Sequence, residues 1–294
     1  MKVGFIGAGK VGCTFGKYLK KNGFDVVGYY SRSFKSAQKG AKEIEGIAFE
    51  SLQELLDLTQ LIFITTPDDA IKKVADEISE YYDIKKGQIF VHMSGALSSK
   101  ELVSLKQKGA YIYSLHPLQS FADIKSALES LCFTVFTIEG DKEKIDIIKN
   151  ILKKCGNRFF TITEELKGLY HASACVVSNY LVTLIDYGLK FYEIMGVDKD
   201  LAIEAVYPLI KGTIENIKEL GTKRALTGPI KRGDVGTIVK HIDSLQNFAP
   251  ELLNLYKILG YETVKLTEGD YKNKSILELK KIKFREKLID PSNN

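Results

Sequence analysis

Three glycines close to the N-terminus restrict the fold more than any other feature of the sequence. They lie at positions 7, 9 and 12, directly after the apolar segment KVGFI and at the start of a predicted helix over residues 11–22. The spacing GxGxxG is common, but between a strand and a helix it is typical of a dinucleotide-binding turn. Gly7 would permit the tight turn, Gly9 the approach of a pyrophosphate, and Gly12 close packing of helix on strand. We therefore expect Gly7, Gly9, Lys10, Val11 and Gly12 to contact a cofactor.

The segment that follows alternates between strand-like and helix-like patterns up to about residue 163. LIFITTP is nearly all apolar and β-branched, as expected of a strand covered on both faces, and QIFVHMSG and AYIYSLHP repeat that form. Strands separated by helices indicate βαβ units and a parallel sheet. After residue 163 the strand signals mostly stop, and residues 164–195 form one long predicted helix. We predict an NADP-binding Rossmann domain (α/β, a mostly parallel doubly wound sheet) over residues 1–163, followed by an all-helical domain for substrate binding and dimerisation over residues 164–294.

The end of the second predicted strand bears on which dinucleotide is bound. Enzymes that use NAD usually have an acidic residue there, which holds the ribose 2′-hydroxyl. This chain has the segment YYSRS instead, in which Arg32 offers a fork of donors and Ser31 and Ser33 offer hydroxyls. These groups suit a 2′-phosphate, so the sequence predicts NADP(H). An exposed loop arginine without a ligand is the alternative.

Polar residues also follow three later strands, whose carboxyl ends should meet at one edge of the sheet. Thr65, Thr66 and Pro67 could form the wall against the cofactor, while Ser94 and Gly95 could face the nicotinamide and the substrate. His116 is either a substrate-binding residue or a histidine that orders its own turn. His92 alternates with Ser94 along its strand and is expected to be a packed strand residue.

The composition and charge of the chain limit the kinds of partner that we expect it to bind. The chain is 45% hydrophobic and 27% charged with a net charge of +5, which is typical of a soluble protein. No apolar run approaches the roughly 18 residues that span a membrane, so we expect no membrane partner. We also expect no nucleic-acid partner, because the basic run KKIKFREK (Lys280–Lys287) is more typical of a solvated helix face.

The four cysteines are scattered and have no metal-ligand spacing. We therefore expect no zinc site or other metal site, and no disulfide framework. The N-terminus starts directly on a strand pattern and lacks the apolar region of a secretory signal. A reduced, cytoplasmic protein is therefore the simplest expectation.

The layout resembles the 6-phosphogluconate dehydrogenase-like superfamily, whose members join an N-terminal NADP domain to a helical substrate and dimerisation domain. In its β-hydroxyacid dehydrogenase and ketopantoate reductase branches, the first helix of the second domain carries Lys-x-x-x-Asn. The resemblance implies that the lysine, here Lys167, donates a proton. Position 171 departs from that pattern, because it is histidine in this sequence.

A closer resemblance covers nearly the full chain. The segments FIGAGKVG, SLHPLQSF, YHASACVVSNYLVTL and LTGPIKRGD together are similar to a group of Rossmann-like proteins with a helical C-terminal domain, DUF2520. Some of that group are described as a third class of ketopantoate reductase, serving pantothenate and coenzyme A synthesis. The resemblance implies NADPH-dependent reduction of a small 2-oxo acid, 2-dehydropantoate, by a protein that forms a homodimer through its helical domain.

The helix that starts near residue 164 carries the candidate catalytic side chains. At about 100° per residue, Lys167, His171 and Ser178 fall on one stripe, and Asn179 lies at its rim. Reduction of a 2-oxo acid requires a proton donor, and either Lys167 or His171 could supply it, since histidine titrates near neutral pH and lysine does so when its pKa is lowered. Ser178 and Asn179 are candidate substrate-binding residues.

Further along the chain, LTGPIKRGDVG contains two more candidates for substrate binding, Thr227 and Arg232. Arg232 could bind a carboxylate through two hydrogen bonds, whereas Asp234 is expected to cap the helix that follows. Two other functions remain open: an imine reductase similar to pyrroline-5-carboxylate reductase, and a non-catalytic protein that binds NADP for regulation.

Overall fold

The structure is a computed structural model in which residues 1–121 and 123–267 are described; the basic run at residues 280–287 lies outside them. Its first part contains a single mixed sheet with the strand order β3-β2-β1-β4-β5-β6-β7-β8. The strands are β1 (Lys2–Ile6), β2 (Asp25–Tyr30), β3 (Ile47–Phe49), β4 (Leu61–Ile64), β5 (Ile89–His92), β6 (Tyr111–Pro117), β7 (Phe136–Gly140) and β8 (Phe159–Thr161). β1 to β6 pair in parallel, β7 is antiparallel to β6, and β8 is parallel to β7. The predicted mostly parallel Rossmann-type sheet is confirmed.

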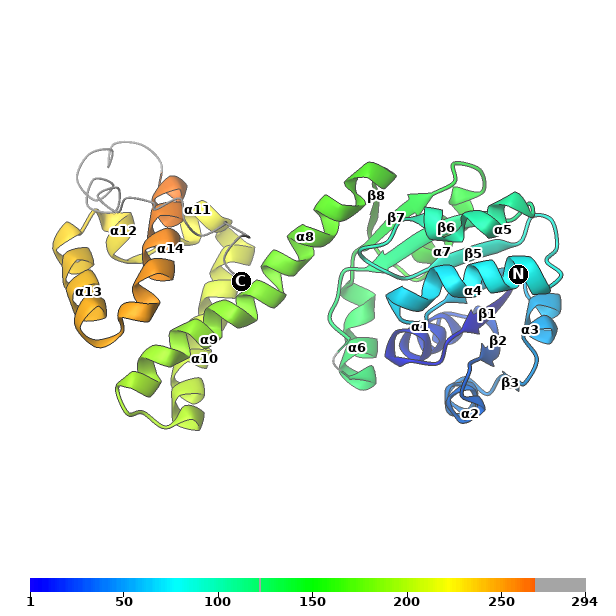
Figure 1. The fold of residues 1–294 in the computed structure, drawn as a ribbon, viewed down its shortest axis with the longest axis horizontal. Helices are drawn as coiled ribbons and strands as arrows, with labels where there is room; N and C mark the ends of the chain where they lie inside the picture. Colours follow the sequence, from blue (N-terminus) through cyan, green and yellow to red (C-terminus); the bar gives the residue numbers. More distant parts are fainter. Residues whose placement is uncertain (122, 268–294) are drawn as a thin grey trace, which may run out of the picture. The chain divides into compact units, whose positions relative to one another are not determined.

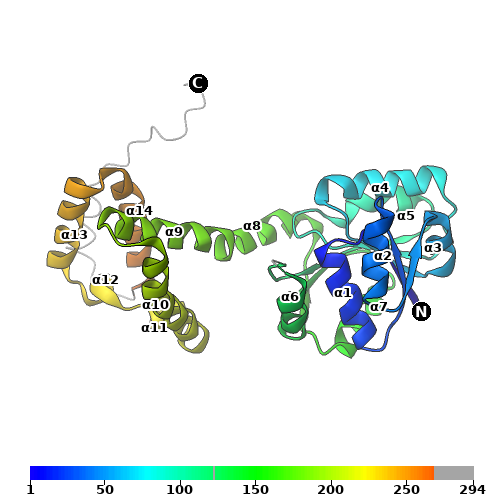
Figure 2. The same ribbon diagram turned by 90° about the horizontal axis from the view of Figure 1, so that it is seen from below.

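Helices cover both faces of this sheet. Side chains of α1, α2 and α7 join the buried cluster on one face, and those of α3, α4 and α5 join the cluster on the other. In Figure 2, α4 and α5 lie above the sheet and α1 and α6 below it. The apolar sequence of β4, whose four residues are all buried, follows from this double cover. The helices are α1 (Lys10–Lys21), α2 (Phe34–Lys42), α3 (Leu52–Leu58), α4 (Asp68–Tyr81), α5 (Val103–Gln107), α6 (Ile124–Ser130) and α7 (Ile145–Lys154), with short 3₁₀ turns η1 (Ser99–Leu102), η2 (Leu131–Phe133) and η3 (Glu164–Leu166).

The chain divides into two compact units, residues 1–178 and residues from 179 onward. Helix α8 (Lys167–Val177) therefore belongs to the same unit as the sheet, whereas the sequence analysis placed the boundary at residue 163. The predicted continuous helix over residues 164–195 is interrupted at Ser178, whose φ of −116° and ψ of −72° depart from α-helical values.

The second unit is helical in its described part. It contains α9 (Asn179–Ile194), α10 (Lys199–Leu220), α11 (Thr222–Ala225), α12 (Gly228–Arg232), α13 (Val235–Phe248), η4 (Pro250–Leu252) and α14 (Leu253–Leu266). The predicted cap is confirmed, because Asp234 accepts a hydrogen bond of 3.0 Å from the Thr237 N–H at the start of α13. The buried clusters of this unit are small, and one of them centres on Tyr187, Leu245 and Leu252. Much apolar surface on α9 and α10 stays exposed as a result.

One helical stretch, Glu164–Ile194, is long and apolar enough to cross a membrane by length and composition. Its mean hydropathy over 18 residues is 1.3, and none of that window is buried. The sequence analysis found no continuous apolar run of this length, since polar residues interrupt the stretch. The mean hydropathy of the stretch is nevertheless high, so its exposed apolar surface needs an explanation.

Substitution of Gly28 in β2 tests how closely β2 and β3 pack at the edge of the sheet. A Cβ atom there would lie 1.9 Å from the carbonyl oxygen of Ile47 in β3, whereas a Cβ atom on the exposed helical Gly168 would meet nothing within 4 Å. We expect Gly28→Ala to lower the free energy of unfolding by about 1–3 kcal/mol, because the β3 backbone at Ile47 would have to shift to relieve the clash. Gly168→Ala should raise it by about 0.5–1 kcal/mol through its helix propensity. Urea denaturation monitored by circular dichroism measures both, and equal effects would contradict the packing argument.

Candidate active site

The glycine-rich turn has the geometry that a bound pyrophosphate requires. Gly7 has a φ of +104°, and a Cβ atom on Gly12 would lie 2.4 Å from the Thr65 Oγ1, so both positions require glycine. A Cβ atom on Gly9, in contrast, would meet nothing within 4 Å, which leaves the backbone open to a ligand. The first turn of α1 contains no acidic residue, and no side chain caps it. Its N–H groups, from Lys10 to Gly12, therefore form an anion-binding helix end.

A cavity of about 410 Å³ opens beside this turn. Several predicted cofactor residues line it, and the structure thereby brings together the ends of β1, β2 and β4: Gly7, Gly9, Ser31, Arg32, Thr65, Thr66 and Pro67. Ser36, Lys73 and Glu77 also line it and were not predicted. In this lining Arg32 and Lys73 carry positive charge and Glu77 negative charge, and the Arg32 guanidinium can bind a 2′-phosphate, so the cavity fits a dinucleotide with that group.

Ser33 has a different place from the one predicted. It is the N-cap of α2 and accepts a hydrogen bond of 3.4 Å from the Ser36 N–H. It does not line the cavity, whereas Ser36 does. Lys10 and Val11 are the first residues of α1 and lie outside the cavity lining as well.

A polar face on the β6–β7 pair forms the second part of the site. Antiparallel pairing places Ser114 opposite Glu139 and His116 opposite Thr137. Alternate residues of each strand point to the same face, so these four side chains share one side of the pair. Their neighbours Leu115 and Ile138 point to the other side and are completely buried in the main core.

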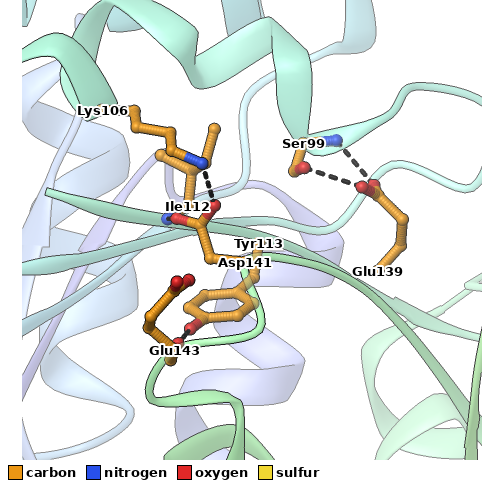
Figure 3. A network of polar contacts seen from close by, with 7 residues as sticks. All are labelled: Ser99, Lys106, Ile112, Tyr113, Glu139, Asp141 and Glu143. Atoms are coloured by element: carbon orange, nitrogen blue, oxygen red, sulfur yellow. Dashed lines mark hydrogen bonds and ion pairs between the residues drawn. The ribbon is translucent and has the colours of Figure 1, made fainter. Parts of the chain in front are cut away.

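Lys167, the first residue of α8, packs on this polar face. It is only 2% exposed, and its Nζ donates a hydrogen bond of 2.6 Å to the Ser114 Oγ. Burial lowers the pKa of Lys167 to about 8, and the carboxylates of Glu139 and Asp68 partly oppose this shift. Both carboxylates also have local partners. Glu139 accepts from the Ser99 N–H and Oγ, each at 2.7 Å, as Figure 3 shows.

Ser94 shapes the turn after β5. Its Oγ donates to the Asp68 Oδ2 at 2.7 Å and accepts from the N–H groups of Ala96 and Leu97. Asp68 directly follows Pro67 of the cofactor cavity, so this hydrogen bond joins the wall of that cavity to the turn that carries Gly95. Ser94 is 6% exposed, and its role is to hold the turn.

Gly95 lies against two histidine rings. A Cβ atom on Gly95 would come within 2.8 Å of the His116 Nε2 and 2.9 Å of the His171 Cδ2. The predicted residues Gly95, His116 and His171 are thus brought together. Burial and, after it, the charge of the nearby Lys167 lower the pKa of His116. His92 is completely buried, as predicted for a packed strand residue, and its ring binds the Ser98 carbonyl at 2.9 Å.

The other predicted substrate residues lie at the break between α8 and α9 and in the second unit. Ser178 and Asn179 are exposed at the break between α8 and α9. Thr227 and Arg232 lie in the second unit, where Thr227 is the N-cap of α12 and Arg232 its last residue. Thr227 lines a cavity of about 440 Å³ within that unit.

Sequence reasoning assigned no role to four residues of the site. Ser114, Asp68 and Glu139 hold Lys167 or the turn after β5, and Tyr170 contacts His116. Tyr170 follows Lys167 by one helical turn, so its spacing was a signal that could have found it.

The environment of Lys167 predicts its titration. In NMR spectra of protein labelled with ¹³C at the lysine Cε, Lys167 should titrate near pH 8. Glu139→Gln should lower that pKa further, because it removes a carboxylate that favours the ammonium form. Lys72, an exposed lysine paired with Asp76, is the internal control and should not change. A higher Lys167 pKa in Glu139→Gln would contradict this electrostatic account.

Comparisons with known proteins agree with this geometry. A protein of Thermotoga maritima has a crystal structure with a TM-score of 0.72 and 28% identity, covering 95% of this chain and 98% of its own. A candidate NADP oxidoreductase of Bacteroides fragilis has a TM-score of 0.69 and 24% identity over 90% and 98%. A 1-pyrroline-5-carboxylate reductase of Streptococcus pyogenes has a TM-score of 0.62 and 16% identity over 96% and 99%.

No curated protein sequence matches the chain significantly. Two family models do match it. The model of the Rossmann-like domain matches residues 1–117, which contain the cofactor cavity, Gly95 and His116. The model of a domain of unknown function, DUF2520, matches residues 134–263, which contain Glu139, Lys167 and all of α8. The chain therefore joins a Rossmann-like domain to a DUF2520 domain.

Proposed function

We propose that the protein is an NADPH-dependent reductase of a small 2-oxo acid, with the reduction of 2-dehydropantoate to pantoate as the first candidate reaction. The observation that carries this proposal is the buried Lys167, whose Nζ lies 2.6 Å from the Ser114 Oγ on a polar face of the same unit as the glycine-rich cradle. A lysine with a lowered pKa is an effective proton donor near neutral pH.

NADPH, when bound, supplies the hydride for such a reduction. Lys167 then supplies the proton to the oxygen on which negative charge develops, and its ammonium group stabilises that charge before the transfer. Ser114 holds the ammonium group in place through its hydroxyl oxygen. The buried position of Lys167 excludes water and strengthens this interaction.

The resemblance to the third class of ketopantoate reductases favours 2-dehydropantoate among 2-oxo acids, and it suggests a role in pantothenate and coenzyme A synthesis. Imine reduction is the second candidate, favoured by the fold shared with a pyrroline-5-carboxylate reductase. Charge discriminates between the two. A protonated imine is cationic and would be repelled by the Lys167 ammonium, whereas a developing alkoxide would be attracted. A non-catalytic NADP-binding protein would not require a buried lysine.

The assay that tests this proposal follows NADPH oxidation at 340 nm with 2-dehydropantoate, other 2-oxo acids and cyclic imines. We expect turnover of 2-dehydropantoate. Lys167→Met should lower kcat by at least about 100-fold, because it removes the proton donor. The kcat of the wild type should fall as pH rises above about 8, since the protonated lysine is the active form. Turnover of imines alone would contradict the proposal that the substrate is a 2-oxo acid. NADPH binding without any turnover would favour the non-catalytic, regulatory alternative.

Arg32 should decide the preference for NADPH over NADH. Its guanidinium group lines the cofactor cavity, and loss of a charge-assisted pair with the 2′-phosphate costs about 1.5–3 kcal/mol. We expect Arg32→Ala to raise the Kd for NADPH by about 10-fold or more and to leave the Kd for NADH nearly unchanged. Lys35→Ala is the matched control, since Lys35 is an exposed cation of α2 outside the cavity lining. Equal effects of the two variants would show that only general positive charge matters.

We further propose that the protein is a homodimer and that a second copy covers the apolar surface of the helical unit. Val182 on α9 is 68% exposed, and Tyr207 and Leu209 on α10 are 61% and 71% exposed. Soluble monomers rarely leave contiguous apolar patches of this kind in water. A second copy is favoured over a membrane because charged residues interrupt both helices, Asp186 and Lys190 on α9 and Lys211 and Glu215 on α10.

Sedimentation analysis should therefore give twice the mass of the chain. Leu209→Glu should shift the equilibrium toward monomer, since it would bury a charge in the interface. Lys218→Glu, which alters charge at another position of α10, should leave the mass unchanged. A monomeric wild type that binds lipid vesicles would contradict this proposal and favour a membrane partner.

A further inference from the structure

His116 uses only one of its two ring nitrogens within the described part of the chain. The Nδ1 atom lies 2.6 Å from the phenol oxygen of Tyr170, and the two rings form an edge-to-face contact with centroids 5.6 Å apart. The Nε2 atom has no hydrogen-bond partner among residues 1–121 and 123–267, and it lies next to Gly95, where a Cβ atom would be only 2.8 Å from it. His116 is also partly exposed.

The hydrogen bond between Tyr170 and His116 has two possible directions. A phenol is the stronger acid of the two groups, and a neutral imidazole nitrogen is the better acceptor, so the phenol O–H donates to Nδ1. A ring nitrogen that accepts a hydrogen bond carries no proton, and the proton of the neutral ring must then be on Nε2. Tyr170 thus selects one tautomer of His116.

The surroundings keep His116 neutral. Burial, and after it the charge of Lys167 and the neighbouring rings of His171 and His92, together lower the pKa of His116 to about 4. Burial also raises the pKa of Tyr170, so the phenol keeps its proton. Both partners are therefore uncharged throughout the neutral range.

We propose that Tyr170 is a positioning residue that holds His116 as the Nε2–H tautomer, so that His116 donates a hydrogen bond to the substrate oxygen beside Gly95. This inference rests on the proposed reductase function and extends it. Lys167 gives the proton, whereas His116 keeps its own and only stabilises the developing charge. A neutral donor suits this place, since a second cation next to the Lys167 ammonium would cost electrostatic energy.

A purely structural role for Tyr170 makes different predictions. Its ring also contacts Phe160, with centroids 6.0 Å apart, and lies near the Lys167 Nζ, 5.6 Å from the ring centroid. Tyr170→Phe keeps the ring and these contacts but removes the hydroxyl. The variant therefore separates the hydrogen bond from the packing.

Nitrogen NMR tests the tautomer without any turnover. In protein labelled with ¹⁵N-histidine, we expect the wild-type His116 to show a protonated Nε2 and an unprotonated, hydrogen-bonded Nδ1 at pH 7. In Tyr170→Phe the Nδ1 resonance should shift toward that of a free ring nitrogen, and the Nδ1–H tautomer should become populated. His92, whose Nδ1 accepts from the Ser94 N–H, is the internal control and should not change. A proton on Nδ1 in the wild type, or identical spectra in the variant, would overturn the proposal.

Kinetics with 2-dehydropantoate test the donor role. Tyr170→Phe should lower kcat by about 10-fold with little change in KM, because the lost interaction acts mainly in the transition state. His116→Gln can place an amide N–H where Nε2 lies, whereas the shorter His116→Asn cannot, so Gln should retain at least about 10-fold more kcat than Asn. Equal losses in these two variants would refute the donor role. If no substrate is turned over, the proposed function fails, while the NMR result still decides whether Tyr170 fixes the tautomer.

Discussion

The site depends on one buried ammonium group, that of Lys167, which must keep its charge although it is shielded from water. Lys167 is almost completely buried, and such a group is stable only where other groups replace its hydration. Here the Ser114 hydroxyl accepts a hydrogen bond from it, and the carboxylates of Glu139 and Asp68 favour its charge without direct contact. Because β7 is antiparallel to β6, Glu139 lies opposite Ser114, and the strand reversal therefore creates the environment of the lysine.

The fold and the cofactor cradle could be predicted from the sequence because their signals are local. The positive φ of Gly7 and the close contact at Gly12 are properties of a few consecutive residues, and the buried strands reveal themselves by uninterrupted apolar segments. Ser33 shows the limit of such reasoning. A serine after a strand suits both a phosphate and a helix cap, and only the position of α2 decides between them.

The surroundings of Lys167 could not be predicted in the same way. Glu139 meets it through strand pairing, and Asp68 lies about a hundred residues away along the chain. Tyr170 was missed although it follows Lys167 by one helical turn, because the predicted polar stripe consisted only of Lys167, His171 and Ser178. His171 stands where the Lys-x-x-x-Asn pattern has asparagine, and in the structure its ring lies against Gly95.

Gly95 carries a consequence for how this protein can change over evolution. Two histidine rings approach it from different elements, β6 and α8, and even a methyl group at this position would collide with both. The two rings can therefore lie this close to the turn only because position 95 has no side chain. Any larger residue at position 95 would require both rings to move, so this position should tolerate less divergence than an exposed glycine such as Gly168.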